Sequence, residues 1–87
     1  MLNEIEIAVL ISICHKTKMS KKVHIPKQYF LNRFKGRKRV YAEKALLSLI
    51  KKGYVIKHPT RGEMTYQLTD FGRKECMKFA GSRYIPF

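Results

Sequence analysis

An amphipathic helix that runs directly into a β-hairpin is the feature that most constrains this 87-residue chain. At about 100° per residue, a helix from Arg37 to Lys52 gathers apolar side chains on one side and polar ones on the other. Gly53 follows as the usual helix stop. The apolar side comprises Ala42, Ala45, Leu46, Leu49 and Ile50, and the opposite side Arg37, Tyr41, Lys44, Ser48 and Lys51. One face should therefore lie in a core and the other in solvent.

The hairpin is indicated by two arms, 54–58 and 64–68, that alternate with a period of two. The link Pro59-Thr60-Arg61-Gly62-Glu63 contains residues that turns use. The simplest register pairs Tyr54 with Leu68, Ile56 with Tyr66, and His58 with Met64. One face of the hairpin would then be apolar and lie on the helices, whereas Lys57 and Thr65 would share the polar face.

A helix is also predicted at the N-terminus. Asn3 and Glu6 fit a reciprocal cap for a helix that runs to about His15. The β-branched content would suit a strand as well, but the cap and two early glutamates favour the helix. Its residues are apolar almost all round, which is more than one core face requires. We therefore expect a second copy of the chain to cover it, in a homodimer formed through helix 3–15 and the C-terminal helix.

Shorter elements complete the domain. Val23–Ile25 predicts a very short strand, and Pro26 suits the first turn of a short helix that runs to Phe34. Thr69 can cap a last helix, with Asp70 at its positive end and Gly81 as its stop. We expect one domain over residues 1–81 and a short aromatic tail over 82–87.

The two cysteines, Cys14 and Cys76, lie far apart and match no metal or redox spacing. We expect two buried thiols in a cytoplasmic, nucleoid-associated protein; the alternative is a disulfide, within or between chains, as in some intracellular proteins of hyperthermophiles. No stretch of about 20 apolar residues predicts a membrane span. The apolar run after Glu4 and Glu6 lacks the basic leader of a signal peptide.

The charge balance points to a polyanionic partner. Nineteen Lys and Arg residues stand against six Asp and Glu residues, for a formal net charge of +13. Such a charge attracts phosphate backbones, and each phosphate neutralised releases counterions and strengthens binding. A merely solubilising surface is usually mixed in sign. An anionic membrane surface is a less favoured partner, because the apolar face of each predicted helix is needed for the hydrophobic core and is not available to insert into a membrane.

Catalytic and metal-binding patterns are weak. No two carboxylates pair at a useful spacing, and no serine has a neighbouring histidine–acid arrangement. His15, His24 and His58 match no known ligand spacing, and there is no glycine-rich phosphate loop. We expect no enzyme, no metal and no cofactor.

The order helix, short strand, helix, tight turn, helix, hairpin, helix resembles that of a winged helix-turn-helix protein. The segments Ala45-Leu46-x-x-Leu49-Ile50-x-x-Gly53-Tyr54-Val55 and Tyr66-x-Leu68-Thr69-x-x-Gly72 are similar to those in regulators of the MarR and PadR type and in small archaeal and archaeal-virus proteins. The resemblance covers about residues 3–80. It implies an α+β fold with a three-helix core, a two-stranded wing with a short third strand, and a C-terminal helix. Two departures from MarR proteins are expected, because these 87 residues predict neither the long flanking dimerisation helices nor an effector domain.

A winged helix would place helix 37–52 in the major groove of DNA and the wing, 54–68, on the backbone or minor groove. Arg39 falls nearer the buried side, so a structural salt bridge is equally expected of it. Lys21, Lys22, Lys27 and Lys35 are candidate phosphate contacts, which position a protein on DNA without specifying sequence. The predicted DNA-binding residues are Arg37, Lys38, Arg39, Tyr41, Lys44, Lys57, Arg61, Lys27 and Lys35, with Thr65 in support.

The sequence leaves three functions open. The first is a transcriptional regulator that binds double-stranded DNA, as a homodimer reading two half-sites. The second is a structural RNA-binding or ribosome-associated protein, for which a charge of +13 is ordinary. The third is a protein-interaction module that uses the apolar first helix and the aromatic tail.

Overall fold

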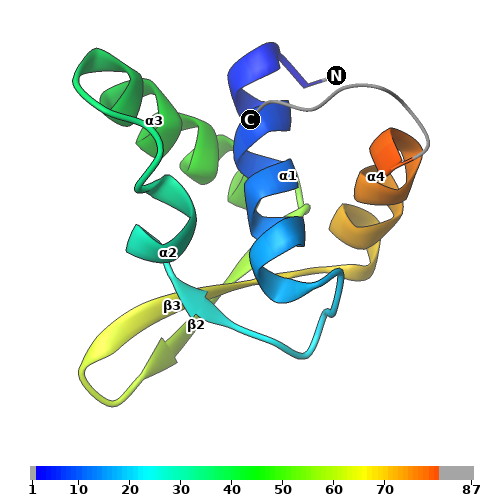
Figure 1. Ribbon diagram of the computed structural model, residues 1–87. Coiled ribbons are helices and arrows are strands. Elements are labelled where there is room, and N and C mark those ends of the chain that lie inside the picture. Colours follow the sequence, from blue (N-terminus) through cyan, green and yellow to red (C-terminus); the bar gives the residue numbers. More distant parts are fainter. Residues whose placement is uncertain (1, 81–87) are drawn as a thin grey trace.

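The computed structural model of the protein describes residues 2–80 (Figure 1). These residues form an α+β fold with four helices and a three-stranded antiparallel sheet. The helices are α1 (Glu4–Thr17), α2 (Gln28–Leu31), α3 (Arg37–Lys51) and α4 (Asp70–Ala80), and the strands are β1 (Ile25–Pro26), β2 (Val55–Thr60) and β3 (Glu63–Leu68). The predicted order of elements is confirmed. The predicted stop at Gly81 and the tail 82–87 lie outside the described residues.

Helix α1 begins at the predicted cap. The backbone N–H of Glu6 donates to Asn3 Oδ1 at 2.8 Å, and the backbone N–H of Asn3 donates to Glu6 Oε1 at 2.9 Å. The helix runs two residues past the predicted end at His15, to Thr17. It ends there because Lys18 adopts a left-handed conformation with φ 54°, from which the helix cannot continue.

Local sequence signals also determine where α3 ends and where α4 begins. Gly53 has φ 88°, and the N–H groups of Tyr54 and Gly53 donate to the carbonyls of Leu49 and Ile50 at 3.0 and 3.1 Å. This is the Schellman arrangement, which satisfies the last carbonyls of a helix and turns the chain out of it. Thr69 Oγ1 accepts from the N–H of Gly72 at 2.9 Å, which confirms the predicted cap of α4.

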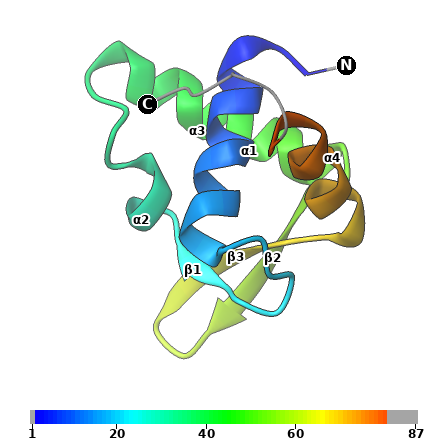
Figure 2. The ribbon, with the colours of Figure 1, turned by 45° about the vertical axis from the view of Figure 1, so that its right-hand side comes forward.

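Helix α1 lies at the centre of the fold. Both ribbon views place it between α2 and α4 (Figures 1 and 2), and it also packs against α3 and β3. Residues Val9–Cys14 are all buried as a result. Most of the apolar surface that a second copy is expected to cover is thus covered by the chain's own elements, and only Ile5, Ile7 and Ala8 are half-buried. The prediction of a homodimer through helix 3–15 loses this argument and stays a prediction.

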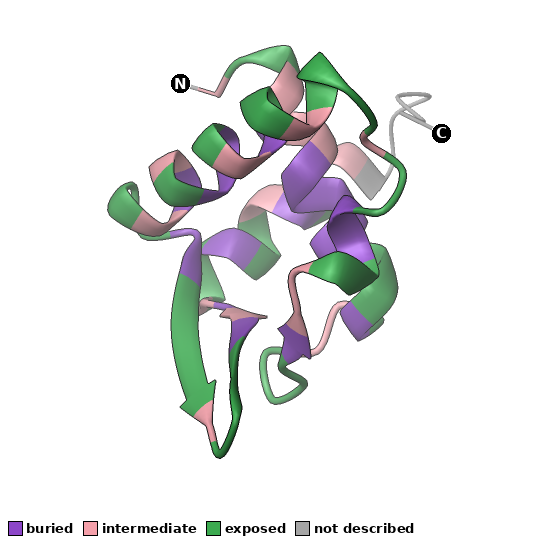
Figure 3. Cartoon of the chain, turned by 90° about the vertical axis from the view of Figure 1, so that its left-hand side faces the viewer, coloured by how far each residue is buried: buried purple, intermediate pink, exposed green. Residues whose placement is uncertain are grey.

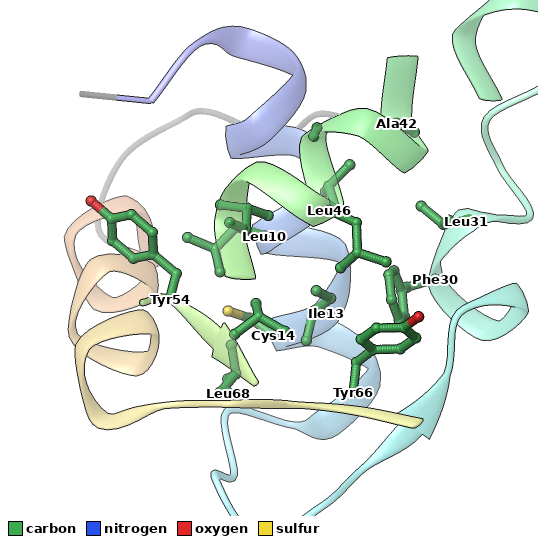
Figure 4. Close-up of a cluster of buried hydrophobic side chains, with 14 of the residues drawn as sticks. Leu10, Ile13, Cys14, Phe30, Leu31, Ala42, Leu46, Tyr54, Tyr66 and Leu68 are labelled. Atoms are coloured by element: carbon green, nitrogen blue, oxygen red, sulfur yellow. The ribbon is translucent and has the colours of Figure 1, made fainter. Parts of the chain in front are cut away.

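The hydrophobic core contains residues from every helix and strand of the described fold (Figure 4). Leu10 and Ile13 of α1 are fully buried and lie in one cluster with Leu46 of α3 and Leu68 of β3. Phe30 of α2 meets Tyr66 of β3 edge to face, with ring centroids 6.0 Å apart. Because α3 takes part in this cluster through one side only, its orientation is fixed by the core.

The predicted register of the hairpin is wrong by one residue. Val55, not Tyr54, pairs with Leu68, and Lys57 pairs with Tyr66. The strands extend through Thr60 and Glu63, so the turn is only Arg61-Gly62, and Gly62 has φ 104°. A shift of one residue moves every side chain of the shifted strand, here β2, to the other face. Val55 is therefore buried in the core, while Ile56, predicted to lie on the helices, is 45% exposed.

The segment before α3 also differs from the prediction. Pro26 does not open a helix; it lies in β1, where it pairs with Thr65, and Ile25 pairs with Tyr66. The predicted strand 23–25 is thus displaced to 25–26, and the helix predicted over 26–34 shrinks to α2. The reason is tertiary: the side chain of Ile25 is buried in the core cluster, which holds this segment on the edge of the sheet.

A disulfide joins Cys14 of α1 to Cys76 of α4, so the prediction of two buried thiols is wrong. The alternative, a disulfide within the chain, holds instead. Packing explains the pairing, because α4 docks on α1 and brings the two buried cysteines together with their Cα atoms 6.6 Å apart. Persistent disulfides are typical of oxidising compartments and of intracellular proteins of hyperthermophiles. Among residues 2–80, no helix is both long and apolar enough to span a membrane.

Removing the disulfide should destabilise the protein strongly. The bond connects residues 62 positions apart, and closing a loop of that length in the unfolded chain corresponds to about 4 kcal/mol. We expect Cys14→Ser/Cys76→Ser to lower the free energy of unfolding by this order, as measured in urea against the oxidised wild type. Thiol titration of the denatured, unreduced protein should detect no free thiol; two free thiols would contradict the bond.

Candidate nucleic-acid interface

The inner side of α3 is held in the core as predicted. Ala42, Ala45, Leu46 and Leu49 are buried, and Ile50 packs at the edge of the cluster. These positions recur at the three- and four-residue spacings of one helical face. The remaining arc of α3 must therefore face away from the core, and Figure 3 shows exposed residues along it.

Glu6 of α1 locks α3 in this orientation. Its carboxylate is buried; it accepts a hydrogen bond from Ser48 Oγ and one from Lys52 Nζ at 2.9 Å. Burial disfavours the charged form, yet the hydrogen bonds from Ser48, from the backbone of Asn3 and from Lys52 outweigh this effect, so its pKa lies below the usual value. Sequence reasoning assigned Glu6 only to the helix cap, because its contacts lie 42 and 46 residues away.

The exposed side of α3 differs in part from the predicted one. Ser48, predicted to lie on the polar side of the helix, is half-buried because it is hydrogen-bonded to Glu6. Val40 and Leu47, which the prediction did not include, are 55% and 60% exposed. We define the outer face of α3 by its exposed residues Arg37, Val40, Tyr41, Lys44, Leu47 and Lys51. The signal for Val40 and Leu47 was in the sequence, since a helical projection places both within the arc opposite the buried residues.

Two of the predicted DNA-binding residues are engaged by an acid. Glu43, on the flank of α3 next to α2, pairs with Lys27 Nζ at 2.9 Å and with Arg39 Nε at 3.3 Å. The hydrogen bond from Lys27 is the main cause of the lowered pKa of Glu43. Arg39 thus takes the structural role that was one of its two expected roles. Lys21, a candidate phosphate contact, likewise pairs with Asp70 at 2.8 Å.

The other predicted cations of α3 are not neutralised. Arg37, Lys38 and Lys44 are exposed and make no ion pair within residues 2–80. Arg37 and Lys44 belong to the outer face, whereas Lys38 lies about 100° round the helix from Arg37. Lys35 is exposed in the turn before α3. The outer face therefore carries a concentrated positive charge.

The hairpin extends from the end of α3 and is mostly exposed (Figure 3). Arg61 lies in its turn and Lys57 on β2, and both are exposed. Thr65 does not share a face with Lys57 as predicted; it is buried, donates to the carbonyl of His58, and lies 3.0 Å from His24 Nδ1. The predicted placement of Thr65 on an exposed polar face is therefore wrong, and its supporting role in binding loses this argument and stays a prediction.

Residues 2–80 contain no cluster of three or more side chains suited to hold a metal ion. A pocket of about 280 Å³ between α1 and α3 is lined by Glu6, Tyr41 and Lys44, among others. The carboxylate of Glu6 in this pocket is already hydrogen-bonded to Ser48 and Lys52.

Comparisons of the chain with protein-family models, with curated proteins and with solved structures gave no match.

The Glu6 contacts should contribute stability that depends on pH. A hydrogen bond to a buried charge contributes about 2 kcal/mol, so we expect Glu6→Gln to lower the free energy of unfolding by about this amount at neutral pH. Because the folded-state pKa is lowered, the contribution is present above the usual pKa of 4.5 and is lost as pH falls through the folded value. Urea unfolding at a series of pH values measures it.

The matched control is Glu4→Gln, in the same first turn of α1 but exposed. Its effect should stay within about 0.5 kcal/mol. Equal decreases in the two variants, or a Glu6 effect that does not diminish as the pH falls below 4.5, would contradict the assignment.

Proposed function

We propose that the chain is a winged helix-turn-helix protein that binds double-stranded DNA, with α3 in the major groove and the β2–β3 hairpin as the wing. The single observation that carries the proposal is the outer face of α3. There Arg37, Lys44 and Lys51 are exposed, without an acidic partner in the described chain, on a helix whose opposite side is fixed in the core.

The arrangement of elements supports this choice. Helices α1, α2 and α3 pack together, a turn at Gly36 separates α2 from α3, and an antiparallel hairpin follows α3 directly. This is the order in which a helix-turn-helix unit and a wing follow each other. An α-helix fits the width of the B-DNA major groove, where arginine and lysine contact guanine edges and phosphates.

The other exposed cations suit the phosphate backbone. Lys35 precedes α3, and Arg61 and Lys57 lie on the hairpin. Contacts of this kind position a protein on DNA, and an arginine at a wing tip can enter a narrow minor groove. Lys27 and Arg39 contribute less, because Glu43 holds them.

We further propose a role in transcription regulation, as a homodimer reading two half-sites. Because most of helix α1 is covered, we place the second copy on α4, whose outer side presents Phe71 and Met77, 52% and 56% exposed. Structured RNA is the second candidate partner, since the net charge of +13 serves either polymer.

Alanine substitutions on the outer face should weaken DNA binding selectively. We expect Arg37→Ala and Lys44→Ala each to reduce the binding free energy by roughly 1–3 kcal/mol, the usual contribution of a side chain that binds a base edge, in titrations of labelled duplex. Lys74→Ala, which removes a cation on α4 that is likewise exposed, is the matched control and should have little effect. If all three variants bind like the wild type, the face assignment is wrong.

Competition binding at matched salt concentration should show whether the protein prefers duplex DNA or structured RNA. We expect a duplex DNA competitor to displace labelled duplex at lower concentration than a structured RNA of equal length. The affinity for duplex should also fall with salt by a slope that reflects several phosphates. A clear preference for RNA would contradict the DNA proposal and support the alternative.

A further inference from the structure

Two aliphatic side chains lie in the middle of the charged outer face of α3. Val40 is 55% exposed and Leu47 is 60% exposed, although both belong to residue types that are usually buried. They are seven residues apart, which is about two helical turns and roughly 10 Å along the axis. Lys44 lies between them on the same side, and Lys51 lies one turn beyond Leu47.

Helix formation alone does not account for an exposed aliphatic side chain at both positions. Valine lowers helix propensity, and although leucine favours a helix, lysine or glutamate would favour it as well without exposing apolar surface. The pair therefore suits a partner that is apolar at two points and anionic around them, because cations alternate with the aliphatic side chains.

The identity of the partner follows from charge and groove chemistry. A second copy of this chain would bring Arg37, Lys44 and Lys51 against cations of the same sign. The major groove of A-form RNA is too deep and narrow for side chains to read. The major groove of B-DNA presents one apolar group, the C5-methyl of thymine, beside phosphates that suit the cations.

We infer that Val40 and Leu47 are specificity-determining residues that contact thymine methyl groups in the major groove. The inference rests on the proposed function and narrows it to duplex DNA that carries thymine at two positions. The aliphatic pair would thus add a preference for thymine to the contacts that the cations of the outer face make with phosphates and guanine edges.

The test replaces thymine by deoxyuridine, which removes the methyl group and keeps the base pair. A preferred duplex is first selected from a random pool, and each thymine in it is then exchanged singly. We expect the affinity to fall about fourfold at two positions, the effect of one buried methyl group, and to stay unchanged elsewhere.

The variants assign each position to a side chain. With Val40→Ala, deoxyuridine at one of the two sensitive positions should no longer change the affinity, and with Leu47→Ala the same should hold for the other. Both side chains are exposed, and alanine favours a helix, so both variants should unfold like the wild type. Met77→Ala, an exposed apolar residue of α4, should leave both sensitivities intact.

The outcomes separate the inference from its premise. Tight duplex binding that is indifferent to every deoxyuridine exchange, or sensitivity that both alanine variants retain, would overturn the thymine contacts and leave the DNA-binding proposal standing. Failure to bind any duplex would overturn both.

Discussion

The packing of α3 against α1 is the interaction on which the rest of the structure depends. Helix α1 is buried along most of its length and receives α2, α3, α4 and β3 around it. Glu6 adds a directional constraint, because its carboxylate must meet both Ser48 and Lys52 on one flank of α3. Rotating α3 would bury its cations and break these hydrogen bonds. The outer face is therefore a consequence of the core.

The distribution of acids makes this face electrostatically distinct. Four of the six acidic residues, Glu6, Glu43, Asp70 and Glu75, are in ion pairs, and none of these pairs involves Arg37, Lys44 or Lys51. Glu43 is the only acid within α3, and it turns toward Lys27 and Arg39. A surface with unneutralised cations on a rigid helix favours binding to phosphates without first breaking internal salt bridges.

Sequence reasoning succeeded where the determinants are local. The cap at Asn3, the stop at Gly53 and the cap at Thr69 depend on neighbours within a few residues, and all three are present. The inner face of α3 followed from helical period alone. The sequence predicts the residues of the outer face only in part. It places Ser48 on the polar side, because the hydrogen bond that draws Ser48 toward Glu6 is a long-range interaction.

The failures have two kinds of cause. The wrong register of the hairpin has a local cause: it depends on a turn of two residues, and sequence reasoning places Pro59 in the turn although the edge strand β2 accommodates it. The other failures have long-range causes. The segment at Pro26 is decided by the pairing of β1 with β3, and the disulfide by the docking of α4 on α1. None of these contacts leaves a periodic trace in the sequence.

The central claim is that α3 meets nucleic acid through its outer face, with the hairpin turn beside it. Backbone amide shifts recorded while a short duplex of mixed sequence is added would test it most directly. The account predicts that the largest changes fall between residues 37 and 51 and around Arg61, with α4 nearly unaffected. Changes concentrated on α4, or no changes along α3, would contradict it.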